Sequence, residues 1–165
     1  MRHSIGVNRI RLDIAPAASP ADLDEARVLL REYVAEVGDC RCFAGFEAEL
    51  AALPGEYAPP GGALLVARAA GRPAGCVALR PIAPGACEMK RLYVRPEFRG
   101  TGLGRALAAE VIAAARRAGY GTLLLDTLPA MTEAIALYRS LGFRSRGPYS
   151  PSPTPGAIFF ELSLS

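Results

Sequence analysis

Short apolar runs bounded by glycine and proline predict most of the strands of this chain. Residues 10–14 alternate apolar and polar side chains, which is the pattern of a half-buried strand. Residues 64–68 and 74–80 flank a turn that contains Gly71 and Pro73, so they predict a hairpin. Further strands are predicted at residues 87–94, 122–126 and 157–162, and a return strand is predicted to begin at residues 142–143.

Apolar residues at helical spacing predict four helices between these strands. The first begins at Ser19-Pro20 and ends at Gly38, and its shared apolar face holds Leu23, Ala26, Leu30, Val34 and Val37. A short second helix is predicted over residues 43–53 and a last one over residues 132–141. The third, residues 104–118, should bury Leu107, Val111 and Ala115, and Gly119 should end it.

The order of the predicted elements is β-α-α-β-β-β-α-β-α-β-β. Residues 122–126 are almost continuously apolar, as expected for a central strand that is buried on both faces. The order predicts an α/β (α+β) fold in which a mixed, mostly antiparallel central sheet carries helices on both faces. We expect a flexible N-terminal tail at residues 1–9 and a single domain over residues 10–165.

Composition narrows the class of protein. The chain has 165 residues, 51% of them hydrophobic and 21% charged, which indicates one folded domain with a substantial core. The net charge of +3 is too small to suggest a nucleic-acid-binding protein, but it suits an enzyme with an anionic cofactor. No apolar stretch is long enough to span a membrane, and residues 1–9 lack the apolar core of a signal peptide. We therefore expect a cytoplasmic protein with no membrane partner.

The cysteines do not predict a metal site. Cys40 and Cys42 are separated by one residue, and Cys76 and Cys87 do not form a second close pair. Since His3 is the only histidine and lies in the predicted tail, we expect no metal and interpret the cysteines as small apolar residues of the core.

The most informative segment is a glycine-rich turn between the strand at residues 87–94 and the helix at residues 104–118. It contains Gly100, Gly102 and Gly104, with Arg99 before it and Arg105 after it. Glycines let backbone N–H groups converge, and the following helix adds the positive end of its dipole. The turn therefore predicts a phosphate-binding loop, and the two arginines favour a pyrophosphate. The spacing fits neither a P-loop nor a dinucleotide fingerprint.

The R-x-x-G-x-G pattern behind a strand that ends in Leu-Tyr-Val resembles the GNAT superfamily of acyl-CoA-dependent N-acyltransferases. The resemblance covers roughly residues 10–163 and implies the same fold. It also implies that acetyl-CoA is the co-substrate and that the loop binds the pyrophosphate of coenzyme A. The implied cofactor-binding residues are Leu92, Tyr93, Val94, Arg99, Gly100, Thr101, Gly102, Leu103, Gly104, Arg105 and Tyr138. Main-chain groups near Leu92 and Val94 are expected to pair with the pantetheine arm.

Tyr138 is the first candidate catalytic residue. It lies in a segment similar to the family's A-x-x-L-Y-x-x-x-G-F, in which the matching tyrosine commonly protonates the departing thiolate. A phenol suits this step because it holds its proton at neutral pH. The alternative is an aromatic residue that only contributes its ring to the core.

Glu88 is the second candidate. It lies eleven positions before Arg99, where several family members carry a base glutamate that takes the proton of the amine. The alternative is a salt bridge with a neighbouring arginine or lysine. Strand alternation predicts that Glu88 shares one side with Leu92 and Val94, and that Met89 lies on the other.

Other positions bear on the cofactor and the acceptor. Where many relatives have an asparagine seven positions before the tyrosine, this chain has Met131, so the adjacent Thr132 either replaces that contact or caps the helix. Tyr149 is a candidate lid over the acceptor, and Arg41 or Arg91 is a candidate carboxylate ligand, although each is more often an ordinary surface residue.

These features predict an N-acetyltransferase that moves an acetyl group from acetyl-CoA to a primary amine of a small molecule by direct attack in a ternary complex. The alternatives are a protein acetyltransferase, acting on N-termini or lysines, and a non-catalytic sensor that binds acyl-CoA. The apolar run at residues 158–160 fits either a homodimer interface or the core. The identity of the amine and the acyl-chain preference do not follow from the sequence.

Overall fold

The computed structural model describes residues 10–38 and 43–165, so the predicted tail at residues 1–9 lies outside the described part. The elements are β1 (Leu12–Pro16), α1 (Pro20–Val37), α2 (Phe46–Ala52), β2 (Ala63–Ala69), β3 (Arg72–Ala83), β4 (Ala86–Val94), α3 (Leu103–Arg117), β5 (Thr122–Thr127), α4 (Thr132–Ser140), β6 (Arg144–Arg146) and β7 (Ile158–Ser163). This confirms the predicted order, and the largest shifts at element ends are at α2, which begins at 46 rather than 43, and β3, which ends at 83 rather than 80.

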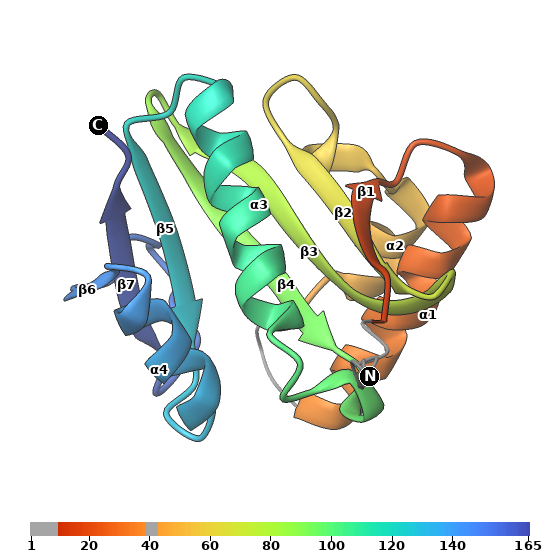
Figure 1. The fold of residues 1–165 in the computed structure, drawn as a ribbon. Coiled ribbons are helices and arrows are strands. Elements are labelled where there is room, and N and C mark those ends of the chain that lie inside the picture. The colour runs from red at the N-terminus through yellow and green to blue at the C-terminus, as the bar shows by residue number, and fades with distance from the viewer. Residues whose placement is uncertain (1–9, 39–42) are drawn as a thin grey trace, which may run out of the picture.

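The strands form one seven-stranded sheet in the order β1-β2-β3-β4-β5-β7-β6 (Figure 1). β4 and β5 are parallel, and the other neighbouring strands are antiparallel. The prediction of a mixed, mostly antiparallel sheet is therefore confirmed.

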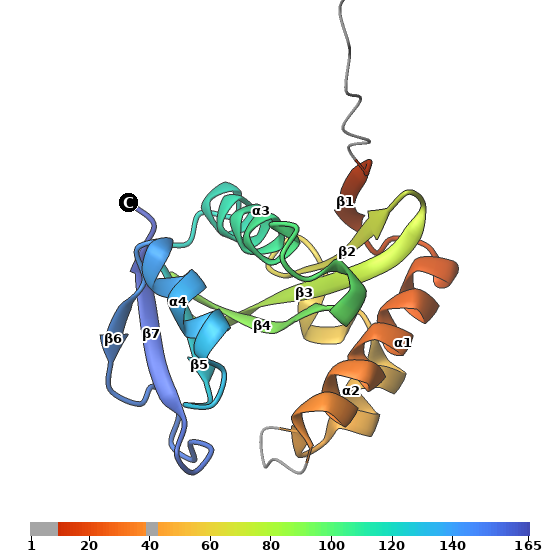
Figure 2. The ribbon, with the colours of Figure 1, turned by 60° about the horizontal axis from the view of Figure 1, so that its bottom comes forward.

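Helices cover both faces of this sheet, with α3 and α4 on one side and α1 and α2 on the other (Figure 2). Under α3 the core contains Leu107, Val111 and Ala115, all fully buried as predicted. Under α1 and α2 it contains Leu29, Leu30 and Leu50. The core under α3 also contains Leu123 and Leu125 of β5, while the core under α1 and α2 is completed by residues of β2, β3 and β4.

Helix α1 begins and ends where its sequence predicts. Ser19 accepts a hydrogen bond from the backbone N–H of Asp22, whose carboxylate accepts one from the backbone N–H of Ser19. This reciprocal capping satisfies N–H groups that have no partner within the helix. At the other end Gly38 has φ +84°, a conformation that glycine adopts without a steric penalty.

The two central strands, β4 and β5, separate along their length. They pair only at Ala86, Cys87 and Glu88, which face Thr122, Leu123 and Leu124. Beyond these pairs the strands diverge, as the ribbon shows (Figure 1). We call these three pairs the seam of the sheet. Beyond the seam, the edge of β4 that faces β5 has no strand partner in the described part of the chain.

A β-bulge in β4 adds to this divergence. Tyr93 lies opposite Cys76 and Lys90 opposite Ala78, so two residues of β4 face one of β3, and Arg91 has φ +62°. The bulge shifts the alternation of side chains: Met89 packs in the same core cluster as Leu92 and Val94. The prediction that Met89 lies opposite these two residues is therefore wrong, because strict alternation holds only in an uninterrupted ladder.

The remaining predictions about composition can be placed on this fold. Strand β7 lies between β5 and β6, and Phe159 and Phe160 are buried, so the apolar run at residues 158–160 belongs to the core and the homodimer stays a prediction. Cys76 and Cys87 are buried free thiols in the core, while Cys40 and Cys42 lie outside the described residues.

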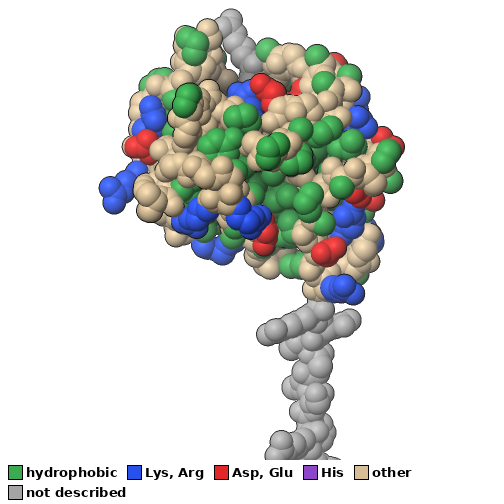
Figure 3. Space-filling view, turned by 90° about the horizontal axis from the view of Figure 1, so that it is seen from above, with side chains coloured by type: hydrophobic (Ala, Val, Ile, Leu, Met, Phe, Trp, Pro, Cys, Tyr) green, Lys and Arg blue, Asp and Glu red, His purple; other side chains and the backbone are tan. Residues whose placement is uncertain are grey.

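The surface of the described residues carries both charged and hydrophobic side chains. The face seen from above carries side chains of both charges around a hydrophobic centre (Figure 3). In the described residues no helix is long and apolar enough to cross a membrane, and no group of side chains is arranged to hold a metal ion.

Candidate active site

A cavity of about 460 Å³ opens where β4 and β5 diverge. Five consecutive residues of β4, Glu88 to Leu92, contribute to its wall, where the edge of β4 runs beyond its pairs with β5. The other walls come from the ends of β3 and β5, from α1 and α4, and from the loop before β7, and they include Tyr33, Val37, Arg80, Ile82, Asp126, Thr127, Leu128, Met131, Ala134, Tyr138 and residues 149–154.

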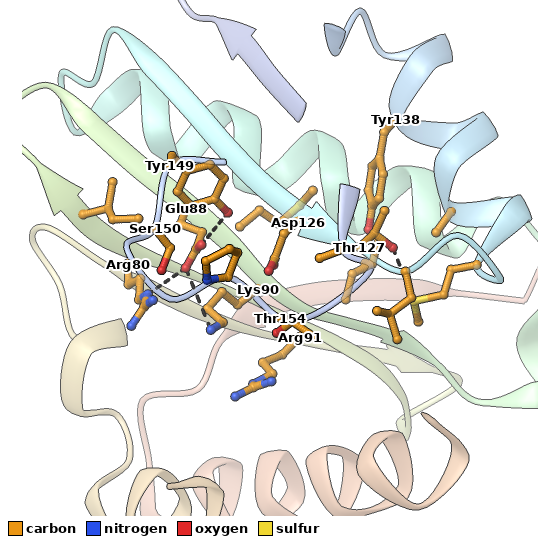
Figure 4. Close-up of a pocket in the computed structure, with 18 of the residues that line it drawn as sticks. Arg80, Glu88, Lys90, Arg91, Asp126, Thr127, Tyr138, Tyr149, Ser150 and Thr154 are labelled. Atoms are coloured by element: carbon orange, nitrogen blue, oxygen red, sulfur yellow. Dashed lines mark hydrogen bonds and ion pairs between the residues drawn. The ribbon is translucent and has the colours of Figure 1, made fainter. Parts of the chain in front are cut away.

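Glu88 lines this cavity, and both of its carboxylate oxygens are engaged (Figure 4). Oε1 accepts a hydrogen bond from Nε of Arg80 at 2.8 Å, and Oε2 accepts one from the hydroxyl of Tyr149 at 2.5 Å. Lys90 lies further away, with Nζ 3.9 Å from Oε1. The predicted alternative, a salt bridge, is therefore present, and it fixes the carboxylate between β3 and the loop before β7.

Asp126, on β5, is a second carboxylate of the cavity, and the sequence analysis did not single it out. It forms no ion pair in the described part of the chain, and its hydrogen bond is to its own backbone N–H. Burial raises the pKa of this carboxyl group above its usual range, and the nearby charge of Glu88 raises it further. The charge of Asp126 interacts with ionisable groups on several elements, namely Glu88, Lys90 and Arg91 on β4, Tyr33 on α1, Tyr138 on α4, and Tyr149 on the loop before β7.

Tyr138 reaches the cavity from α4, on the side opposite to Tyr149 (Figure 4). Its ring packs edge-on against Phe143, with ring centroids 5.8 Å apart, and lies 6.4 Å from that of Phe160. Burial raises the pKa of its hydroxyl group, so the phenol keeps its proton at neutral pH. The ring contributes to the core, as the alternative predicts, and the residue also lines the cavity, so its role as the acid stays a prediction.

The glycine-rich turn lies between β4 and α3. Gly100 and Gly102 have φ of +77° and +84°, and a Cβ added at either would have no heavy atom within 4 Å. Gly102 caps α3 with no side-chain hydrogen bond, and the first N–H groups of a helix have no partner within it. The turn is therefore open and carries the positive end of the α3 dipole, which fits an anionic phosphate.

The two arginines of the turn have partners in the described structure. Arg99 donates to the backbone oxygen of Val94 at 3.0 Å and contacts both carboxylate oxygens of Glu36, on α1, at 2.6 and 2.7 Å. Arg105 donates to Oγ of Ser140, on α4, at 2.5 Å. Both arginines therefore lie beside the turn, and each is engaged by a side chain of a neighbouring helix.

The side chains of the other predicted cofactor-binding residues differ in their contacts and burial. Thr101 donates its hydroxyl proton to the backbone oxygen of Phe98, and the side chain of Leu103 is buried in the core. Tyr93 packs in the cluster under α1 and lies 3.3 Å from Glu32, so its side chain faces away from α3. Leu92 and Val94 pack against the cluster on the α3 side.

Three further predictions concern the acceptor and α4. Arg91 is buried, pairs with Glu49 at 3.1 Å and lies over the rings of Phe43 and Phe46, so it is committed to α2, while Arg41 lies outside the described residues. Thr132 is exposed and does not cap α4, because the cap position is Met131.

The loop before β7 supplies a contact that the sequence did not indicate. Tyr149 is bonded to Glu88, its ring packs edge-on against Phe159 at 5.5 Å, and burial raises the pKa of its hydroxyl group. The proline-rich composition of residues 148–156 and the aromatic residue within it were the available signals. The partner, sixty-one positions away, was not readable from them.

Comparison with known proteins identifies what this chain is similar to. The family model described as "Acetyltransferase (GNAT) family" matches residues 26–143. An uncharacterised N-acetyltransferase of Schizosaccharomyces pombe is 42% identical over 156 residues, which cover 93% of this chain and 96% of that protein. An IAA acetyltransferase of Azospirillum brasilense is 42% identical over 102 residues, which cover 61% of this chain and 67% of that protein.

Among solved structures, the PaiA N-acetyltransferase of Thermoplasma acidophilum in complex with coenzyme A has the same fold. Its TM-score is 0.74 at 18% identity, and the match covers 93% of this chain and 99% of that one.

Proposed function

This chain belongs to the GNAT acetyltransferase family and is an acyltransferase, and on that premise we propose that it moves an acetyl group from acetyl-CoA to a primary amine of a small molecule. The observation that carries the proposal is the cavity between the diverging β4 and β5, which joins Tyr138 from α4 to the carboxylates of Glu88 and Asp126. The coenzyme A complex of the Thermoplasma acetyltransferase supports acetyl-CoA as the co-substrate.

The cofactor's phosphates are proposed to bind at the open turn. Residues Arg99 to Arg105 supply two arginines and the N-terminal end of α3, and both suit a pyrophosphate. Beyond the seam, the unpaired edge of β4 near Leu92 and Val94 offers main-chain groups to the pantetheine arm. That arm would then lie between β4 and β5 and direct the thioester toward Tyr138.

The transfer is proposed to be direct, within a ternary complex. The amine must first lose a proton, and its nitrogen then attacks the thioester carbonyl carbon as the carbon–sulfur bond breaks. The thiolate takes the proton of the Tyr138 hydroxyl, and the second proton lost by the nitrogen restores the tyrosine. Overall, one amide and one thiol form and one proton is released.

The residue that takes the first proton is a choice between two carboxylates. The sequence assigns this step to Glu88, but Arg80 and Tyr149 engage both of its oxygens. Asp126 lines the same cavity without an ion pair in the described chain. We therefore assign the step to Asp126 and the positioning of the Tyr149 loop to Glu88.

The experiment is acetyl transfer across a panel of amines, detected by mass spectrometry of the product. The panel spans amino acids, polyamines, aminoglycosides and short peptides. Turnover of a small amine above the hydrolysis background supports the proposal, while turnover of peptides alone supports a protein acetyltransferase. Binding of acetyl-CoA without any transfer supports a sensor.

The variant Tyr138→Phe separates an enzyme from a sensor. We expect kcat to fall by roughly 10²-fold or more while acetyl-CoA affinity is kept, because the ring still packs on Phe143 and Phe160. Tyr120→Phe is the matched control, since Tyr120 donates its hydroxyl proton to Gly61 and does not line the cavity. Unchanged turnover in Tyr138→Phe would contradict the assignment of the acid.

A cytoplasmic location is the remaining part of the proposal, and it rests on the composition of the chain alone.

A further inference from the structure

The cavity presents two opposite charges that the fold itself does not neutralise at close range. Lys90 and Asp126 both line it, on the two strands that diverge (Figure 4). Each affects the ionisation of the other, yet no ion pair joins them within the described residues. A molecule that carries both a cationic and an anionic group could pair with Asp126 and with Lys90 at the same time.

The other charged side chains of the cavity have close partners. Arg80 binds Glu56 and Glu88, each at 2.8 Å, and Arg91 binds Glu49 at 3.1 Å. These arginines are therefore held by carboxylates of the protein, and a substrate would have to displace a partner to use them.

Lys90 differs from these arginines. In the described structure it makes no hydrogen bond, and its single ion pair, with Glu88, is 3.9 Å long. Its side chain is only 19% exposed, and burial lowers the pKa of its ammonium group. A half-buried ammonium with no close partner is costly, and a carboxylate that replaces its lost hydration would relieve that cost.

The ordinary alternation of β4 explains how Lys90 comes to face the cavity. Lys90 lies two residues after Glu88, in the regular part of β4 before the bulge, so the two side chains share one side of the strand and both line the cavity beyond the seam. Lys90 is also the only lysine of the chain, in which all other basic side chains except that of His3 are arginines.

From this juxtaposition, and resting on the proposed function, we propose that the acceptor is an amino acid. Its amine is received by Asp126 and its carboxylate by Lys90, with the two groups separated by only a few bonds. Asp126 takes the proton as described above, so the amine nitrogen is free to attack the thioester while Lys90 holds the other end of the molecule.

Pairs of acceptors that differ only in the carboxylate test this directly. Each pair is an amino acid and the amine left when its carboxyl group is removed, such as phenylalanine with phenethylamine and free lysine with cadaverine. A charge-assisted hydrogen bond predicts that kcat/KM for the amino acid exceeds that for the amine by roughly 10- to 100-fold.

The variants Lys90→Met and Lys90→Arg probe the cation. We expect Lys90→Met to reduce the preference for the amino acid toward unity and Lys90→Arg to restore part of it. Arg116→Met is the matched control, because Arg116 is exposed at the end of α3 and does not line the cavity. Its preference ratio should equal that of the parent protein.

A binding measurement keeps this inference separate from the proposed function. Reductive methylation with isotopically labelled formaldehyde adds one side-chain NMR signal, at Lys90, which its absence in Lys90→Met identifies. We expect phenylalanine to shift this signal and phenethylamine to leave it in place. No shift with any amino acid of the panel, or equal shifts with both members of each pair, would overturn the inference.

The two proposals fail in different ways. If the amines are acetylated as well as the amino acids, the amino-acid inference is wrong and the proposed function stands. If nothing is acetylated but amino acids alone shift the Lys90 signal, the proposed function is wrong and the binding inference stands.

Discussion

Two carboxylates of one cavity have different surroundings, and this difference is the basis of the different roles proposed for them. Glu88 is fixed by Arg80 and Tyr149, while Asp126 forms no ion pair in the described chain and has a raised pKa. A raised pKa makes the Asp126 carboxylate a stronger proton acceptor than an ordinary aspartate. Asp126 therefore suits the base and Glu88 the support of the loop.

Isosteric variants test these roles through the pH dependence of kcat/KM. Because Asp126 must be ionised to accept a proton, activity should rise with pH through its raised pKa. Asp126→Asn should remove this limb and lower kcat/KM by roughly 10²-fold or more. Glu88→Gln should keep the limb and lose less activity. A profile in which Glu88→Gln abolishes the limb would return the base to Glu88.

The same substitution should have the opposite effect on stability. The fold favours the protonated form of Asp126, so its contribution is full below the usual pKa of an aspartate and is lost as pH rises through the raised value. Asp126→Asn should therefore raise Tm at neutral pH, and the gain should shrink as pH falls through the raised pKa and vanish below about 4. Thermal unfolding across this pH range measures it.

For single residues, the sequence predicts a place in the site when the residue belongs to a motif, and it misses residues whose place depends on distant contacts. Glu88 and Tyr138 both line the cavity, as their motifs suggested. Asp126 ends an apolar strand and Lys90 precedes a bulge, and neither belongs to a recognisable pattern. Their significance depends on the divergence of β4 and β5, which is a property of the sheet.

Two glycines at the ends of α3 have a similar positive φ but lie at opposite ends of the helix. Gly102, in the turn before the helix, has φ +84°, and Gly119, after it, has φ +87°. A Cβ added at either position would have nothing within 4 Å, so substitution would cost backbone strain and no steric clash. Comparing substitutions at the two positions therefore distinguishes an effect on stability from an effect on the proposed cofactor binding.

Gly102→Ala and Gly119→Ala should each destabilise the protein by about 1–2 kcal/mol, the usual cost of a left-handed conformation with a side chain. We expect only Gly102→Ala to raise KM for acetyl-CoA, because its strain reshapes the turn proposed to bind phosphate. Chemical denaturation and steady-state kinetics on both variants measure this. Equal KM values would remove the turn from the cofactor site.

Elements were predicted well where apolar periodicity or a terminating residue marks them. The capping residues of α1 and the glycine after α3 gave correct ends. The bulge in β4 was not predicted, because an arginine at φ +62° has no local signature, and it altered which side chains share a face.

A close approach at one glycine joins two strands of the sheet to α3. At Gly75, on β3, an added Cβ would lie 2.5 Å from the backbone oxygen of Tyr93 and 3.2 Å from Cδ1 of Leu107. The position therefore joins β3, β4 and α3 without room for a side chain.

Gly75→Ala should destabilise the fold by about 1–3 kcal/mol, as overpacking commonly does. Gly147→Ala is the control, because a Cβ there meets nothing within 4 Å and the glycine has no left-handed backbone. The free energy of unfolding from urea titration measures both. A neutral Gly75→Ala would mean that both the backbone of β4 at Tyr93 and the side chain of Leu107 can move away from β3 at little cost.

The two strands of the seam are separated in the sequence by α3, so the residues that line the cavity are synthesised in two stages. The residues of β4 that line the cavity are complete once Leu92 has been synthesised. The lining residues of β5 begin at Asp126, after the whole of α3. A growing chain that has reached the end of α3 therefore contains the glycine turn but neither Asp126 nor Tyr138. Such a chain holds the elements proposed to bind the phosphates before it holds those proposed to carry out the transfer.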